Sequence, residues 1–443
     1  MVVEAWLARA AAVRPKHIAL DAPEGSCTYA ELFMAASIAE SDLAHRGVGK
    51  GDRVAIALPA GLDFAHALHA CLLLGAVAVP IDPRLSVPER TRIVEGCAIL
   101  VEEPLNPGCR STPGLAREAG HDLRATAVVI YTSGTTSKPK PVELTYGNFL
   151  WSALGSAVAL GIDPRERWLC ALPLSHVGGL SILLRSAIYG TTAVVHERFE
   201  TDRVLHALRE DEITLVSLVT TTLTRLLDAN LERPPRLRCA LIGGGPVPAA
   251  LVERADAAGV PVSTTYGLTE SCSQVTTAPA AAIARGDLAA GPPLFCTRVR
   301  TGADGEIMVA GPTVSPQACD GDGWLHTGDL GVLDESGRLW VTGRKVETIV
   351  SGGENVSPAE VEAVLEDHPH VLEAAVVGRT DEQWGEAVVA IVVGRPECDP
   401  DRELLRAHCA AALAPYKVPK EVELRSEPLP RTYSGKLLRR ELR

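Results

Sequence analysis

Short apolar stretches of strand character alternate with helical stretches along most of this chain. The predicted strands that carry the pattern cover residues 54–58, 76–81, 192–195, 214–219 and 239–242. A predicted helix over 63–74 separates the first two of them. Strands that alternate with helices form βαβ units, whose strands pair in parallel. The pattern therefore predicts an α/β fold built on parallel sheets.

The chain has 443 residues, which is too many for one hydrophobic core. Strands and turns fill 305–342, and near Gly343 the pattern changes to a compact region with helices of its own. We therefore expect a large domain over 1–343 and a small C-terminal domain over 344–443.

Two predicted capping boxes mark helix starts. Thr28 and Glu31 form the first, and Ser357 and Glu360 form the second, with Pro358 at the first helical position.

Composition narrows the function. The formal net charge of −12 argues against a nucleic-acid partner and against docking on an anionic membrane, so a small-molecule substrate fits better. The N-terminus lacks the apolar core of a signal peptide, and the most apolar stretch, 67–81, is shorter than a bilayer requires. We expect a cytoplasmic protein without membrane insertion. Eleven cysteines without a CxxC pair indicate neither a zinc site nor a disulfide framework.

The segment Tyr131–Lys140, YTSGTTSKPK, follows an apolar run and is crowded with hydroxyl groups. Such a turn offers hydrogen-bond donors to an anion, and Gly134 lets the backbone approach it closely. Ordinary surface turns have the same composition, so the segment alone leaves a plain turn open. Its spacing is not that of a Walker A loop. The candidate phosphate-binding residues are Thr132, Ser133, Gly134, Thr135, Thr136 and Lys140.

Two further segments end predicted strands. CALIGGGPV runs from a strand into the triple glycine Gly243, Gly244 and Gly245, whose backbone can approach a flat ligand or an anion. A plain strand-to-helix connection remains the alternative. In TTYGLTE, Tyr266 is placed to stack on a base and Glu270 to hold Mg²⁺, a cation that prefers carboxylate and phosphate oxygens.

Two more segments carry charge in turns. In GWLHTGDLG, the carboxylate of Asp329 lies between glycines and is suited to accept two ribose hydroxyls, although Asp beside Gly is commonly a turn former. LPRTYSGKLLR carries Lys436 near the end of the chain, where a solvated basic tail is the alternative.

In this order, the motifs YTSGTT, GGGP, YGLTE, GWLHTGDLG, GRKVETIVSGGENVSP and LPRTYSGK resemble those of the ATP-dependent adenylate-forming acyl-CoA synthetase superfamily. The resemblance spans nearly the whole chain. It implies layered parallel βαβ sheets with a distorted β-barrel subdomain, followed by a small mobile α+β lid domain. It also implies two steps: a carboxylate attacks the α-phosphate of ATP, releasing pyrophosphate, and the thiol of CoA then displaces AMP. Family habit suggests a homodimer or a higher assembly.

The resemblance assigns the catalytic roles. Lys436 matches the family lysine that bridges the acyl carboxylate and the phosphate, where positive charge offsets the repulsion of two anions. Thr269 and Glu270 match the contacts to the α-phosphate and to Mg²⁺. The contacts to the β- and γ-phosphates match Thr132, Ser133 and Thr135, with Gly134, Thr136 and Lys140 beside them. The adenine contacts match Tyr266, Gly267 and Gly243 to Gly245. The ribose contacts match Asp329 and Arg344.

Three positions depart from the family pattern. Ser137 and Pro141 stand where the phosphate loop usually has Gly, and Val346 stands where the domain hinge often has Asp or Lys. Pro fixes φ and removes a donor, so we expect a stiffer loop. Rotation of the C-terminal domain between the two steps remains the expectation.

The acid-binding segments look closest to the 2-succinylbenzoate-CoA ligases of menaquinone biosynthesis. The segments are PLSHVGGLSILLRSAIYGTTAVVHERF, YGLTESCSQ and AAGPPLF. Their substrate is an aromatic dianion, whose pocket needs polar donors amid apolar walls. The polar candidates are His176, Ser181, Arg185, Thr221, Ser273 and Gln274. Alternatives are a solvent-exposed Arg185 and a satisfied core histidine at His176.

Three other functions remain open. A different aryl-CoA or medium-chain acyl-CoA ligase would share every ATP motif. A domain that loads amino acids onto a carrier protein fits less well. The altered phosphate loop also allows a nucleotide-binding protein with weakened catalysis, against which the retained Lys436, Glu270 and Asp329 argue.

Overall fold

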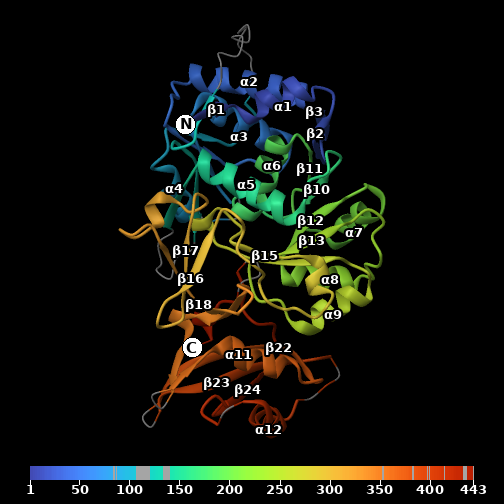
Figure 1. Cartoon of the computed structure of the whole chain (residues 1–443), viewed down its shortest axis with the longest axis vertical. Coiled ribbons are helices and arrows are strands. Elements are labelled where there is room, and N and C mark those ends of the chain that lie inside the picture. The colour runs from blue at the N-terminus through green and yellow to red at the C-terminus, as the bar shows by residue number, and fades with distance from the viewer. Residues whose placement is uncertain are drawn as a thin grey trace.

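The computed structural model shows a molecule with a large upper part and a smaller lower part that contains the C-terminus (Figure 1). It describes residues 1–82, 85, 87–105, 120–132, 140–351, 354–381, 384–396, 398, 400–413, 415–432 and 437–442. In these residues, no helix is both long and apolar enough to cross a bilayer. The ten cysteines in them are free thiols.

Two mainly parallel sheets form the upper part. The five-stranded sheet has the order β6 (Ile99–Val101), β4 (Arg53–Ile56), β5 (Val77–Pro80), β8 (Thr126–Thr132) and β9 (Lys140–Thr145). The eight-stranded sheet has the order β15 (Thr276–Ala278), β14 (Val262–Tyr266), β13 (Cys239–Ile242), β12 (Leu215–Leu218), β10 (Arg167–Cys170), β11 (Thr192–Val195), β2 (Ile18–Ala22) and β3 (Gly25–Thr28). Strands β14 to β2 pair in parallel, as the alternating pattern predicts.

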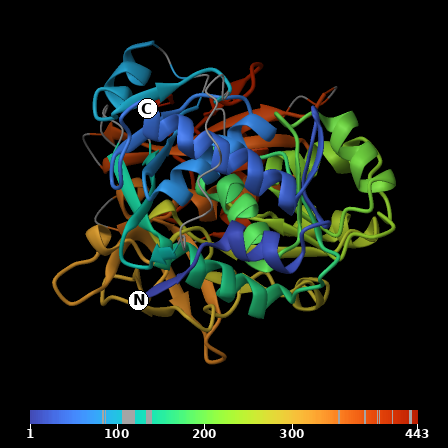
Figure 2. The ribbon, with the colours of Figure 1, turned by 90° about the horizontal axis from the view of Figure 1, so that it is seen from above.

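Helices lie between the two sheets and share one core with both. They are α1 (Trp6–Val13), α2 (Tyr29–His45), α3 (Leu62–Leu74), α5 (Tyr146–Leu160) and α6 (Val177–Tyr189). Seen from above, the blue helices of the N-terminal region lie over the rest of the chain (Figure 2). The other face of the eight-stranded sheet is covered by α7 (Thr201–Glu210), α8 (Thr220–Asp228) and α9 (Ala249–Ala257). The short elements of this part are β1 (Val2–Glu4), which pairs with β7 (Gly120–Asp122), α4 (Val87–Val94), the 3-10 helix η1 (Thr269–Ser271) and α10 (Ala280–Ile283).

A four-stranded antiparallel sheet follows and connects the upper and lower parts. Its order is β16 (Arg298–Thr301), β17 (Glu306–Ala310), β18 (Leu325–Leu333) and β19 (Leu339–Arg344), with the 3-10 helix η2 (Pro316–Ala318) between β17 and β18. The 3-10 helix η3 (Lys345–Glu347) then leads into the lower part. This sheet is the element expected as a distorted barrel subdomain, and it is open rather than closed in the described chain.

The lower part is an α+β unit with its own sheet. The strands are β20 (Ile349–Ser351), β21 (Glu354–Val356), β22 (Val371–Asp381), β23 (Gly385–Gly394) and β24 (Glu421–Arg425). One face packs on α11 (Pro358–Glu366) and α12 (Arg402–Ala412), and the other is covered by the C-terminal tail, which ends in η4 (Arg439–Glu441). The separate core agrees with a division near 343, but the boundaries 1–343 and 344–443 stay a prediction.

One predicted capping box is confirmed and the other is wrong. The Thr28 hydroxyl accepts from the Glu31 N–H, and the Glu31 carboxylate accepts from the Thr28 N–H. At α11 the helix starts where Ser357 and Pro358 predict, but Ser357 Oγ donates to the carbonyl of Thr342 at 2.5 Å and caps no helical N–H. A tertiary contact to β19 has replaced the local one.

Glu366, on α11, holds a proton near neutral pH. Burial, together with the neighbouring carboxylate of Glu362, raises its pKa to about 7. Arg431 opposes the shift, whereas Glu373 adds to it. In the unfolded chain this carboxyl has its ordinary pKa of 4.5, so the folded state binds the extra proton between these two values. Its contribution to stability is thus fully present below 4.5 and is lost as pH rises through about 7.

Replacing this carboxyl with an amide tests the linkage. We expect the change in the free energy of unfolding caused by Glu366→Gln to be more stabilising at pH 8 than at pH 4.5 by about 1–3 kcal/mol, because the amide cannot ionise. Urea unfolding at both pH values measures the difference. Glu360→Gln, at an exposed carboxylate of the same helix, is the control. A Glu366→Gln effect equal at both pH values would contradict the linkage.

Candidate functional site

The carboxyl ends of neighbouring parallel strands bring the predicted motifs to one edge of the eight-stranded sheet. Strands β12, β13 and β14 are adjacent. β13 and β14 lead directly into Gly243 and Gly267, and β12 leads through Val219 into Thr220. In open α/β sheets this edge is where ligands bind, because the strand-to-helix loops there present free backbone groups. Figure 1 shows the C-terminal part of the chain below the upper domain.

Tyr266, Asp329 and Arg344 form a connected group where the eight-stranded and four-stranded sheets meet. Tyr266 Oη donates to Asp329 Oδ2 at 2.8 Å, and Arg344 Nε lies 2.8 Å from Asp329 Oδ1. The register of β18 and β19 places Asp329 opposite Arg344. Asp329 is only 6% exposed. Burial, together with the Asp329 carboxylate, raises the pKa of Tyr266, so its hydroxyl remains a donor. The two predicted ribose residues and the predicted adenine platform are therefore neighbours.

The turn after β14 is folded tightly around Gly267. A Cβ atom there would lie 1.5 Å from the carbonyl oxygen of Ser273, so the position requires glycine. Cys272 and Ser273 have left-handed backbones, with φ of 54° and 88°. Each such conformation costs a residue with a side chain roughly 1–2 kcal/mol. Strain of this kind collects at functional turns, and this turn holds Thr269 and Glu270.

Glu270 is tied to the strand that follows the predicted phosphate-binding segment. Its carbonyl accepts from the N–H of Ser315 at 2.7 Å, and Ser315 Oγ donates to the carbonyl of Glu143 in β9 at 2.7 Å. The Glu270 side chain is partly exposed. No group of three His, Cys, Asp or Glu side chains in the described residues is arranged to hold a metal ion. One carboxylate fits Mg²⁺ nonetheless, because this ion commonly combines one or two carboxylates with phosphate oxygens.

β8 and β9 form the hairpin that carries the phosphate-binding segment. Thr132 pairs with Lys140, and Tyr131 pairs with Pro141. β9 is an edge strand, where a proline is tolerated although it lacks an N–H. Six predicted residues lie outside the described residues: Ser133, Gly134, Thr135, Thr136, Ser137 and Lys436.

The triple glycine follows β13. Gly244 has φ +85°, a conformation that glycine adopts without strain. A Cβ at Gly243 would lie 3.0 Å from Thr265 Cγ2, whereas one at Gly245 would meet nothing within 4 Å. The turn therefore leaves backbone accessible at the edge of the sheet. Thr221, in the first turn of α8, follows the adjacent strand.

Arg185 is buried in α6 with an incomplete set of partners. It is 3% exposed, which contradicts the alternative of a side chain in solvent. Its Nη2 donates to Ser152 Oγ at 3.0 Å and its guanidinium lies over the ring of Trp168, but its Nε has no partner. Among the described residues, no Asp or Glu carboxylate forms an ion pair with it, and burial lowers its pKa. A buried cation without an anion is costly, so Arg185 marks a place suited to an anionic ligand.

Other predicted acid-binding residues lie on the same or neighbouring elements. Ser181 is buried one turn before Arg185 in α6, and its Oγ has no partner in the described structure. Gln274 is buried as well; its Nε2 donates to Thr277 Oγ1 at 2.8 Å, and its Oε1 has no partner. Ser273 is partly exposed. Buried polar atoms without partners are rare, and several together indicate a binding region.

His176 is exposed at the N-cap of α6, so the alternative of a core histidine is wrong. Its carbonyl accepts from the N–H of Leu180 at 3.0 Å. The position follows the carboxyl end of β10, beside the same edge of the sheet as Thr221.

Sequence reasoning missed Ser152 and Cys272. Ser152 Oγ accepts from Arg185 and donates to the carbonyl of Cys272 at 2.6 Å, so it links α6 to the strained turn. The only available signal was a serine in a mostly apolar helix, which it shares with Asn148 and Ser156. Nothing in the sequence predicts the left-handed backbone of Cys272, because cysteine does not favour that conformation.

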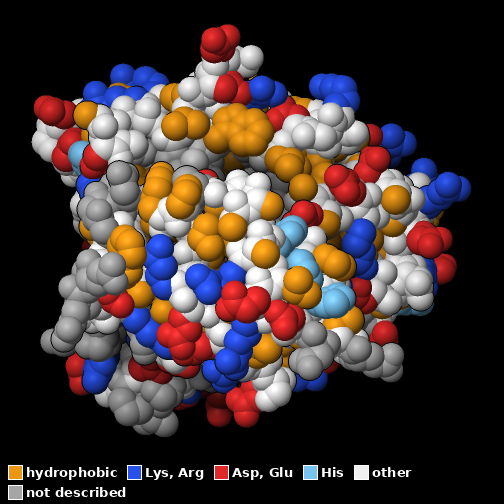
Figure 3. Space-filling view, turned by 90° about the horizontal axis from the view of Figure 1, so that it is seen from below, with side chains coloured by type: hydrophobic (Ala, Val, Ile, Leu, Met, Phe, Trp, Pro, Cys, Tyr) orange, Lys and Arg blue, Asp and Glu red, His pale blue; other side chains and the backbone are white. Residues whose placement is uncertain are grey.

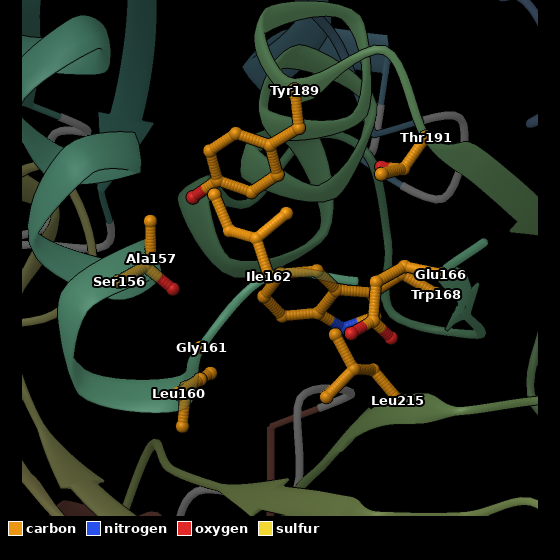
Figure 4. A pocket seen from close by; sticks show the side chains of 10 residues that line it. All are labelled: Ser156, Ala157, Leu160, Gly161, Ile162, Glu166, Trp168, Tyr189, Thr191 and Leu215. Carbon is orange, nitrogen blue, oxygen red and sulfur yellow. The ribbon is translucent and has the colours of Figure 1, made fainter. Parts of the chain in front are cut away.

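A small cavity beyond Arg185 is separate from this site (Figure 4). Tyr189 borders it and donates from its hydroxyl to the carbonyl of Ala153 in α5, and Trp168 and Leu215, near the starts of β10 and β12, line it. The predicted residues follow the opposite, carboxyl ends of these strands. The cavity therefore lies toward the wrong edge of the sheet to hold the nucleotide.

The nucleotide fits this arrangement on three grounds. The glycine turns leave backbone open, the Tyr266–Asp329–Arg344 group offers a ring and a carboxylate for a nucleoside, and Thr269 and Glu270 lie in the turn that follows.

Comparisons with known proteins agree with this geometry. The sequence profile of the AMP-binding enzyme matches residues 7–101 and 101–317, and that of the AMP-binding enzyme C-terminal domain matches 360–436. The 2-succinylbenzoate–CoA ligase of Bacillus subtilis is 40% identical, over 99% of this chain and 97% of the relative.

Solved structures give the same result. o-Succinylbenzoate CoA synthetase from Bacillus subtilis, in complex with ATP and magnesium ion, is 39% identical with a TM-score of 0.92, and each chain is covered fully. The complex of that enzyme with the acyl-adenylate intermediate is 40% identical with a TM-score of 0.90, covering 100% of this chain and 98% of that one. A fatty acyl CoA synthetase of Mycobacterium tuberculosis has 29% identity, a TM-score of 0.77, and coverage of 99% and 97%. This chain belongs to the AMP-binding enzyme family, and it is an acid–thiol ligase of the acyl-CoA synthetase type.

Proposed function

We propose that this protein is an ATP-dependent 2-succinylbenzoate–CoA ligase of menaquinone biosynthesis. The observation that carries the proposal is the buried Arg185, which pairs with no carboxylate of the described residues and is linked through Ser152 to the strained turn. It offers an aromatic dianion the second cation that the dianion needs. Full-length similarity to ligases of this name supports it. We further propose a cytoplasmic location, and assembly into a homodimer or higher oligomer stays a prediction.

The first step joins two anions. A carboxylate oxygen of the acid attacks the α-phosphorus of ATP, and the bond from that phosphorus to the bridging oxygen breaks, so pyrophosphate leaves with the electron pair. Lys436 bridges the carboxylate and the α-phosphate in our proposal and offsets their repulsion. Thr269 holds an α-phosphate oxygen. Mg²⁺ held by Glu270 would supply further positive charge to the phosphates.

The remaining nucleotide contacts follow the geometry. We assign Asp329 and Arg344 to the ribose and Tyr266 with Gly267 and the triple glycine to adenine. Thr132 and Lys140 flank the segment assigned to the β- and γ-phosphates. Because Tyr266 already donates to Asp329, ring and carboxylate are oriented before ATP binds, which lowers the entropy cost of binding.

The second step forms the thioester. The sulfur of CoA attacks the acyl carbon, AMP leaves from it, and the thiol proton is released. We propose that residues 344–443 turn relative to 1–343 between the steps. The ATP complex of the relative from Bacillus subtilis matches this chain with a TM-score of 0.92, and a double mutant of it with a product analogue matches with 0.75, at 39% identity in both. Equal sequence similarity with unequal fit supports two arrangements of one fold.

The activity test uses ATP, Mg²⁺, CoA and 2-succinylbenzoate, with mass detection of the thioester. Benzoate and octanoate run in parallel. Thioester formation from benzoate or octanoate, with none from 2-succinylbenzoate, would assign the chain to the other aryl-CoA or medium-chain ligases. No turnover with any acid would favour a nucleotide-binding protein with weakened catalysis.

Replacing Lys436 tests the first step. We expect Lys436→Ala to lower acid-dependent exchange of pyrophosphate into ATP by at least about 100-fold, the effect of losing one preorganised donor to developing charge. Lys16→Ala is the control, because Lys16 is an exposed lysine near the other end of the chain; it should leave the exchange rate unchanged. An unaltered rate in Lys436→Ala would refute the assignment.

Arg185 is tested with two substrates that differ by one carboxylate. We expect Arg185→Gln to raise the KM for 2-succinylbenzoate about 10- to 100-fold, since a hydrogen bond to a charged group contributes about 1.5–3 kcal/mol. The KM for 4-oxo-4-phenylbutanoate, which lacks the ring carboxylate, should change by less than about threefold on the same scale. Equal changes for both acids would show that Arg185 does not recognise the second carboxylate. His176→Ala and its combination with Arg185→Gln extend the same measurement.

A further inference from the structure

The C-terminal tail is anchored on the outer face of the small sheet. Leu429, Leu437 and Leu442 belong to one cluster with the outer side chains of β22 and β23. The N–H of Leu438 donates to the carbonyl of Pro430 at 2.8 Å, and Arg431 forms an antiparallel bridge with Leu437. The chain on both sides of the segment that contains Lys436 is therefore fixed, although Lys436 itself lies outside the described residues.

Arg439 joins this tail to two other elements. Its Nη2 donates to Glu362 Oε2 at 2.6 Å and its Nε to Glu362 Oε1 at 3.2 Å, so α11 receives a two-pronged contact. Its Nη1 donates to Glu347 Oε2 at 2.6 Å. Glu347 ends η3, the segment that leaves β19 directly after Arg344. One side chain thus bridges the tail, a helix and the connection to the ribose residues.

The contact is largely withdrawn from water. The side chains of Arg439 and Glu362 are 18% and 13% exposed. The carboxylate of Glu362 also accepts from the N–H of Val376 in β22 at 2.7 Å, so its position is set by the sheet as well. Salt screens such a pair less than an exposed one, and its geometry is better defined.

A second ion pair holds the other side of the segment. Arg431 Nη2 donates to Glu373 Oε2 at 2.7 Å, and Glu373 lies on β22. Figure 3 shows the lower face of this domain, where Lys and Arg side chains lie among Asp and Glu side chains. Arg431 and Arg439 lie on either side of Lys436 in the sequence, so their ion pairs hold both ends of that segment. Of the two, Arg439 also forms an ion pair with Glu347 in η3.

We propose that Arg439 is a positioning residue for adenylation, which holds residues 437–442, directly after Lys436 in the sequence, against η3 and α11. The inference rests on the proposed role of Lys436. Arg439 suits the task because its planar guanidinium donates to both carboxylates in a fixed fork, whereas a lysine ammonium is a single point charge on a flexible chain. A displacement of about 1 Å at a reacting group costs up to about 100-fold in rate.

The half-reactions separate positioning from folding. Lys436 serves only the first step in the proposed mechanism. Arg439→Lys, which keeps the charge and loses the fork, should lower the kcat of pyrophosphate exchange about 10- to 100-fold, the effect of a displacement near 1 Å. The KM for ATP and the rate of thioester formation from added acyl-adenylate should stay within about twofold, since neither depends on that geometry. Glu362→Gln, which keeps an acceptor for Val376, should act in the same direction.

A matched variant controls for the loss of any ion pair from α11. Glu360 lies on the same helix and pairs with Lys417 at 2.6 Å, away from the tail. Glu360→Gln should change neither half-reaction. The melting temperature of each variant is measured together with its rates. If Arg439→Lys and Glu362→Gln lowered the melting temperature and slowed both half-reactions in parallel, the proposal would be overturned in favour of a structural role.

The double variant Arg439→Lys with Lys436→Ala decides whether the two residues act together. If Arg439 acts through Lys436, adding Arg439→Lys to Lys436→Ala should lower the residual exchange rate by no more than about twofold, because the two losses share one cause. A full additional loss would overturn the proposal. The failure of the proposed function looks different: in that case Lys436→Ala itself would leave exchange unchanged.

Discussion

Electrostatic repulsion between a carboxylate and a triphosphate is the constraint that the rest of this structure serves. Bringing two anions into contact requires cations and N–H groups that are fixed in place beforehand, because reorganising them during the reaction would cost the energy that they are to supply. A parallel sheet provides such a place, since the loops at its carboxyl edge converge. In this protein β12, β13 and β14 lead into that edge, and the hairpin of β8 and β9 reaches it from the second sheet through Ser315.

The second anionic group of the proposed substrate explains an otherwise costly feature. A guanidinium buried among apolar side chains lowers stability unless it is paired. Arg185 has a hydroxyl, an aromatic face and no carboxylate among the described residues, and Ser152 connects it to the strained backbone of Cys272. In our proposal, this cost in stability lies at the place where an acid with two carboxylates is distinguished from an acid with one. The same reasoning explains why the turn at Gly267 accepts two left-handed residues in sequence.

Much of this was predictable from the sequence, and the exceptions have physical causes. The βαβ alternation, the helix that starts after Thr28 and the proximity of Asp329 and Arg344 depend on local patterns or on motif spacing, and the structure shows all three. The capping box at Ser357 failed because its hydroxyl found a partner in β19 that is distant in sequence. The burial of Arg185 and the roles of Ser152, Glu347 and Glu362 depend on packing between elements, which no local pattern reveals. The assignments of individual residues to ATP and acid remain predictions from the resemblance.

The most direct test of the account is the exchange of labelled pyrophosphate into ATP without CoA, measured with 2-succinylbenzoate and with no acid. If the acid is adenylated before the thiol reacts, the exchange of pyrophosphate into ATP should require both 2-succinylbenzoate and Mg²⁺ but no CoA. Exchange that is absent with this acid under conditions in which the folded protein binds ATP would contradict the account.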